Sequence, residues 1–190
     1  MPEPTIRPLT VGLLGTCCYI LSLPERDDCV VIDPGADADR IRQAAEGRRI
    51  AAILLTHGHF DHIAAVRALM DDGAALVIHE LDAPMLGDPE RNASWLVGPR
   101  VTAPEATCLI HEGDHITYAG ITFTVLHTPG HTPGSVCYRA GDALFSGDTR
   151  FRSGYGRTDL PGGSMRELRR SLARLEPLLG EAILYPGHEA

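Results

Sequence analysis

Three histidines and one aspartate stand within residues 57–62 (HGHFDH), directly after the apolar run 50–55. The apolar run predicts a buried β-strand, and the periodicity of residues 62–70 predicts a helix after it. Polar side chains crowded at this strand-to-helix junction would be costly to bury without partners. A divalent cation supplies the partner, because imidazole and carboxylate groups are ligands of zinc and related first-row ions. The segment therefore predicts a fold that carries a metal centre.

The spacing within this segment predicts two neighbouring metal positions. His57 and His59 project the same way from extended chain, because side chains alternate with period two. Asp61 and His62 lie where the chain turns into the helix, so they can point toward an adjacent position. Four ligands from one segment rarely complete two sites, so we expect further ligands from elsewhere in the chain.

Three other segments share one pattern, in which an apolar strand is followed by a glycine and then by a ligand-type residue. The residues in question are His131, Asp148 and His188. Binding groups are commonly mounted on loops that a rigid scaffold holds in place. We therefore predict that these three residues complete the metal sites.

Other polar residues have supporting roles in this interpretation. Asp33 and Thr56 are candidates to orient the metal-binding histidines, or are ordinary turn caps. Arg157 is a candidate to bind an anionic substrate, or forms a structural pair with Asp159. Structural roles are expected for His79, His111, His115 and His127.

Composition narrows the function classes. The formal net charge of −8 disfavours nucleic acid as a partner. No apolar run reaches the length of a membrane span, and residues 1–4 do not begin a signal peptide. The five cysteines show no C-x-x-C spacing, so we expect free, mostly buried thiols in a cytoplasmic protein.

The order of the predicted elements favours a layered α/β domain with mixed sheets. Residues 87–104 are expected to form a long surface loop, either a binding wall or a plain connection. Helices are expected at 38–45, 62–70 and 165–179. Strands are expected at 11–23, 29–32, 50–55, 76–78, 116–118, 121–126, 135–138, 143–145 and 182–185.

Taken in order, these motifs resemble the metallo-β-lactamase superfamily, and most closely its glyoxalase II-like hydrolases. The resemblance covers nearly the whole chain. It rests on the T-H-x-H-x-D-H signature at 56–62 and on the runs 31–35, 127–135, 145–148, 156–159 and 186–188. It implies a single domain, residues 1–190, that forms a four-layer αββα sandwich of two mixed β-sheets flanked by helices.

The resemblance also implies a ligand set for two divalent metal ions. His57, His59 and His131 would hold one ion. Asp61, His62 and His188 would hold the other, and Asp148 would bridge both. Zinc is the expected metal, with iron or manganese as alternatives, because mixed imidazole and carboxylate sets hold any of them.

The function implied by the resemblance is hydrolysis of a small-molecule thioester or a related small ester. Two ions would lower the pKa of a bridging water from about 15.7 toward about 7, and the resulting hydroxide would attack the carbonyl carbon. Asp61 is the expected catalytic residue, as a ligand that also orients the nucleophile or accepts its proton. The antibiotic-degrading β-lactamases lack an aspartate bridge at the position of Asp148, which favours a thioesterase-like hydrolase.

Two departures from glyoxalase II weigh against lactoylglutathione as the substrate. Those enzymes add a C-terminal helical region, whereas this chain ends two residues after His188, and they carry a tyrosine that the run 157–159 lacks. Several alternatives stay open: a mononuclear iron persulfide dioxygenase using His57, His131 and Asp148, a metal-dependent lactonase or phosphoesterase, and a non-enzymatic binding module. A metal-dependent nuclease is disfavoured by the net charge.

Overall fold

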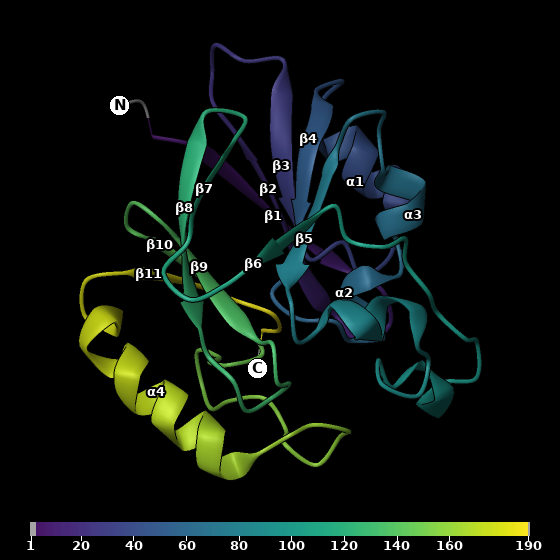
Figure 1. Ribbon diagram of the computed structural model, residues 1–190. Coiled ribbons are helices and arrows are strands. Elements are labelled where there is room, and N and C mark those ends of the chain that lie inside the picture. Colours follow the sequence, from purple (N-terminus) through teal and green to yellow (C-terminus); the bar gives the residue numbers. More distant parts are fainter. Residues whose placement is uncertain (1–2, 190) are drawn as a thin grey trace.

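Two β-sheets packed face to face form the centre of the protein in the computed structural model, which describes residues 3–189 (Figure 1). One sheet has the strand order β1-β2-β3-β4-β5-β6, and the other has the order β11-β10-β9-β8-β7. The first sheet consists of β1 (Thr5–Val11), β2 (Thr16–Ser22), β3 (Asp28–Ile32), β4 (Arg49–Leu54), β5 (Ala75–His79) and β6 (Cys108–Ile110). The second consists of β7 (His115–Tyr118), β8 (Ile121–His127), β9 (Val136–Ala140), β10 (Ala143–Gly147) and β11 (Ile183–Pro186).

Both sheets are mixed, as the sequence predicts. In the first sheet, β1, β2 and β3 pair antiparallel and β3 to β6 pair parallel. In the second, the meander from β7 to β10 is antiparallel, and β11 pairs parallel with β10. Parallel pairing requires crossover connections, and helices provide several of them.

Helices cover the outer face of each sheet and complete four layers. Figure 1 shows α1 and α3 on one outer side and α4 on the opposite one. The helices are α1 (Ala38–Ala44), α2 (Phe60–Ile63), α3 (Val66–Leu69) and α4 (Met165–Leu179), with short 3₁₀ turns at Ala83–Gly87 and Ser94–Leu96. The predicted αββα sandwich is therefore confirmed.

Successive side chains of a strand point to opposite faces of its sheet, and here side chains on both faces are buried. In β3, Val30 faces the core between the sheets, whereas Val31 packs under the helices with Ile41 of α1. On the far side, Leu144 of β10 packs against Leu175 of α4. Strands buried on both faces read as continuous apolar runs, which is the pattern that made them recognisable in the sequence.

Two predicted elements need correction, and two strands were missed. The expected strand 11–23 contains the last residue of β1, a reversal through Gly12 and Gly15, both at positive φ, and then β2. The strands β1 and β6 were not predicted at their observed positions. The expected helix 62–70 begins earlier and is broken into α2 and α3.

The remaining expectations for the chain fit the described residues. Residues 87–104 form a loop that is interrupted by one short 3₁₀ turn. The five cysteines are free, and all but Cys108 are buried. Within residues 3–189, no helix has both the length and the apolar character needed to cross a membrane.

Candidate metal centre

Three imidazoles converge where β4 and β8 end. Nδ1 of His59 lies 2.9 Å from Nε2 of His131, and Nε2 of His57 lies 3.2 Å from the same atom. All three side chains are buried. We call His57, His59 and His131 the first ligand group. Burial, reinforced by the neighbouring histidines, lowers the pKa of His59 to about 3 and holds that of His57 well below its usual value. These two rings are therefore neutral and offer lone pairs.

In two of the three rings, His57 and His131, a hydrogen bond on the far side sets which nitrogen faces the group. Thr56 Oγ1 donates to Asp33 Oδ2 at 2.6 Å, so its remaining lone pair accepts from Nδ1 of His57 at 3.1 Å. Nδ1 of His131 donates to the backbone carbonyl of Arg157 at 2.7 Å. Each bond places the proton on Nδ1 and leaves the Nε2 lone pair pointing inward. Asp33 and Thr56 thus lie beside one of the histidines that they are predicted to orient.

A second cluster combines a carboxylate with two imidazoles. Oδ2 of Asp61 lies 3.6 Å from Nε2 of His62 and 3.3 Å from Nε2 of His188. We call Asp61, His62 and His188 the second ligand group. Nδ1 of His188 donates to the carbonyl of Leu14 at 3.1 Å, and Thr16 Oγ1 donates to Asp61 Oδ2 at 3.2 Å. The turn between β1 and β2 and the first residue of β2 therefore orient two members of this group.

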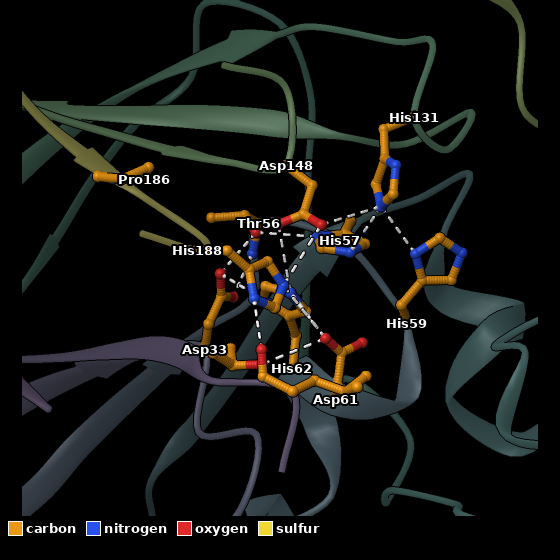
Figure 2. A network of polar contacts seen from close by, with 12 residues as sticks. Asp33, Thr56, His57, His59, Asp61, His62, His131, Asp148, Pro186 and His188 are labelled. Atoms are coloured by element: carbon orange, nitrogen blue, oxygen red, sulfur yellow. Dashed lines mark hydrogen bonds and ion pairs between the residues drawn. The ribbon is translucent and has the colours of Figure 1, made fainter. Parts of the chain in front are cut away.

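Asp148 lies between the two groups (Figure 2). Its Oδ2 is 3.5 Å from Nε2 of His131 and 3.6 Å from Nε2 of His188. Its Oδ1 is 3.4 Å from Nε2 of His62. One carboxylate thus faces ligand atoms of both groups, which is the placement that a bridging ligand requires.

Charge is distributed differently in the second group. Burial alone would raise the pKa of Asp61, but the charge of His62 and the hydrogen bond from His188 hold it well below its usual range. Burial acts to lower the pKa of His62 and His188, yet the surrounding carboxylates outweigh it and raise both. The pKa of Asp148 is lowered by the same histidines, against its burial. The raised pKa values of these two histidines thus favour a proton where a cation would otherwise balance the carboxylates.

The donor set fits a pair of divalent ions. In the part of the chain that the structure describes, His62 Nε2 and Asp148 Oδ1 are buried without a hydrogen-bond partner. Ligand atoms of His57, His59 and His131 lie within 4.8 Å of one another, as do those of Asp61, His62 and His188. Buried polar atoms that lack partners are costly, and coordination of a cation removes that cost.

The recurrent glycine before each ligand has a steric cause at two positions. A Cβ on Gly187 would run into Oδ1 of Asp148, and one on Gly147 would run into Oγ1 of Thr56. Gly147 also has a φ of 49°, which favours glycine. These loops approach each other too closely for side chains, so the glycine in the sequence pattern is a packing requirement of the site.

The other residues singled out in the sequence lie apart from the two groups. The exposed Arg157 guanidinium pairs with Asp159 through two hydrogen bonds of 2.6 and 2.7 Å, so only its backbone contacts the first group. His79 stacks on His127 with ring centroids 4.1 Å apart. His111 lies 3.3 Å from a carboxylate oxygen of Glu80.

Sequence reasoning missed three residues that contact the site or its loops: Leu14, Thr16 and Asp82. Leu14 acts through its carbonyl and Thr16 through a hydroxyl in an apolar strand, so neither carries a sequence signal. Asp82 follows a histidine and a glutamate in a stretch without a recognisable motif.

Fold and site together define a protein that binds divalent metals at loops that follow the ends of strands in two facing sheets. The sequence matches the family model of the metallo-β-lactamase superfamily over residues 11–188. The chain belongs to this superfamily, whose members include metallo-hydrolases.

Two relatives of known sequence show which kinds of enzyme this chain is similar to. A probable metallo-hydrolase, YqgX, of Bacillus subtilis (strain 168) is 35% identical over 96% of this chain and 89% of its own length. Hydroxyacylglutathione hydrolase of Yersinia pestis (strain Pestoides F) is 36% identical over 90% of this chain, but only 61% of that enzyme is matched.

Two solved structures share the fold closely. BLEG-1, a B3 metallo-β-lactamase, superposes with a TM-score of 0.91 at 38% identity, covering 97% of this chain and 91% of its own. TTHA1623, in a di-iron-bound form, superposes with a TM-score of 0.81 at 36% identity, covering 96% and 91%.

Proposed function

We propose that this protein is a dinuclear metal-dependent hydrolase of a thioester or a related small ester. The observation that carries the proposal is the placement of Asp148, whose two oxygens face ligand atoms of both groups. The two ligand groups and Asp148 would hold two neighbouring ions, which would supply charge stabilisation for attack by water on an acyl carbon.

Residues of the chain would have separate roles in this reaction. The metal pair, when bound, lowers the pKa of a water molecule toward about 7. Asp61 stays a carboxylate because its pKa is low, so it can bind metal and accept a hydrogen bond from the attacking water. Thr16 fixes the orientation of that carboxylate through its hydroxyl. Arg157 is our candidate to contact an anionic part of the substrate, since its backbone adjoins His131.

The thioester is favoured by the hydroxyacylglutathione hydrolase among the relatives. The likeness to BLEG-1 makes a β-lactam the first competing substrate, and lactones and phosphoesters follow. Zinc is the proposed metal, but the di-iron form of TTHA1623 makes iron a specific alternative.

The persulfide dioxygenase alternative rests on a smaller set of the same residues. His57 and Asp148 both approach His131, at 3.2 and 3.5 Å, and two histidines with one carboxylate can hold a single iron. The second ligand group would then have no metal to bind. We place hydrolysis first because the three residues of the second group converge as a second metal site would require.

Elemental analysis of the purified chain, paired with a substrate screen, tests the proposal. We expect two ions per chain and hydrolysis of thioesters in preference to β-lactams. His59→Ala should lose metal and hydrolysis together, whereas His115→Ala, an exposed change on β7, should keep both. One iron per chain with oxygen uptake on a persulfide would replace hydrolysis by dioxygenation. Thioester hydrolysis by metal-free protein would refute the mechanism.

A further inference from the structure

Asp82 is a buried carboxylate outside both ligand groups. It lies between β5 and the 3₁₀ turn Ala83–Gly87, and its exposed fraction is 0%. Burying a carboxylate is costly unless hydrogen bonds surround it. The contacts that Asp82 makes therefore indicate what the fold gains from it.

Three donors from two separate loops converge on this carboxylate. The backbone N–H of Gly58 donates to Oδ2 at 3.0 Å, and the hydroxyl of Thr132 donates to the same oxygen at 2.6 Å. The backbone N–H of Gly134 donates to Oδ1 at 2.6 Å. Hydrogen bonds to an ionised acceptor are roughly twice as strong as neutral ones, so this is a firm connection between the loops.

The two loops are those that supply the first ligand group. Gly58 stands between His57 and His59, and Thr132 directly follows His131. Asp82 forms no hydrogen bond with these imidazoles. It holds the backbone N–H between His57 and His59 and the hydroxyl of the residue that follows His131.

Close packing leaves the loops little freedom to shift around Asp82. A Cβ on Gly58 would approach the Cβ of Met85 to 2.7 Å, and one on Gly134 would approach Asp82 itself to 2.7 Å. Both loops are thus seated directly against the segment that begins at Asp82.

We propose that Asp82 is a positioning residue, which sets the distance between the 57–59 loop and the 131–134 loop and thereby gives the first ligand group its affinity for metal. This inference rests on the proposed metal centre. It concerns metal binding rather than the reaction, so it is tested without a substrate.

The test compares Asp82→Asn with Asp28→Asn. Asparagine keeps the size of Asp82, but in either orientation its NH₂ faces a donor, Gly134 N–H or Gly58 N–H. Asp28 is also a buried aspartate, yet it binds Arg26 at the start of β3, far along the chain from the ligands. The control therefore reports the general cost of losing a buried carboxylate.

Zinc affinity, measured by competition with a chromophoric chelator, and the absorption spectrum of the cobalt(II)-loaded protein are the readouts. We expect Asp82→Asn to bind zinc about 10- to 100-fold more weakly, with an altered cobalt spectrum. Asp28→Asn should match the wild type in both. Equal weakening in the two variants, or an unchanged affinity in Asp82→Asn, would overturn the proposal.

A further variant covers the case in which Asp82→Asn does not fold. Thr132→Val removes one of the three hydrogen bonds and should weaken zinc binding less, in the same direction; unchanged binding would overturn the proposal. A wild-type protein that holds two ions but hydrolyses no thioester would refute the proposed function and leave this inference standing.

Discussion

The two ligand groups are neighbours, yet they differ in chemistry and in setting. The first consists of imidazoles alone, all of them buried, and at least two are neutral without metal. The second contains a carboxylate, the pKa values of its histidines are raised, and the side chain of His188 is 20% exposed. An imidazole set suits zinc, whereas carboxylate ligands are acceptable to iron and manganese as well. We infer that the first group binds the tighter ion and that the second tolerates more kinds of metal.

Removing the bridge tests whether the two groups work as one site and should have the largest effect. Asp148→Ala should lower metal content from two ions to less than one and reduce hydrolysis by about 10³-fold, or about 4 kcal/mol. Elemental analysis and kcat measure this. Asp142→Ala, at the opposite end of β10, is exposed and serves as the matched control. Two ions retained in Asp148→Ala would show that the groups fill independently.

A smaller effect is expected when the second group alone is damaged. His188→Ala should keep one ion in the first group and lose the other, with hydrolysis reduced by about 10²-fold, or about 3 kcal/mol. Metal titration followed by activity at each stoichiometry separates the two ions. If His188→Ala lost both ions, the proposed order of affinities would be reversed or the groups would be inseparable.

Some ligands were easier to predict from the sequence than others. Residues 57–62 are predictable as ligands because one strand-to-helix junction supplies two ligands to each group. The spacing along the chain indicates which ligands belong to which group. His131, Asp148 and His188 come singly from distant strands, so their prediction as ligands rests on the repeated strand, glycine and ligand pattern together with the family resemblance. Their convergence depends on sheet order, which a local pattern does not encode.

Failures of prediction have physical causes as well. The strand β6 has three residues, too few for a period to show, and the outward positions of β1 interrupt its apolar pattern. The role of Asp82 was not predicted because its hydrogen-bond partners lie 24 to 52 residues away along the chain. A carboxylate that hydrogen-bonds to backbone N–H groups leaves no sequence pattern in the loops that it holds.

The smallest effect concerns the metal-free protein, in which the groups should respond oppositely to pH. The pKa of His59 falls to about 3 on folding, from about 6.5 in the unfolded chain. The unfolded state then binds more protons between these values, so folding stability falls as pH drops through that window, by about 1 kcal/mol per unit. The raised pKa of His62 and His188 works the other way. Their contribution is complete below about pH 6.5 and is lost as pH rises through their folded values.

Urea unfolding of chelator-treated protein across this range should therefore show maximal stability near about pH 6.5. His59→Gln should flatten the acid side, because the buried neutral imidazole is gone. His188→Gln should flatten the alkaline side, because a proton that the carboxylates hold is gone. If both variants changed the same side of the profile, the two groups would titrate as one network. Adding zinc should flatten the alkaline side, since the ions replace the protons of the second group. It should steepen the acid side, because protons compete with zinc for the imidazole lone pairs.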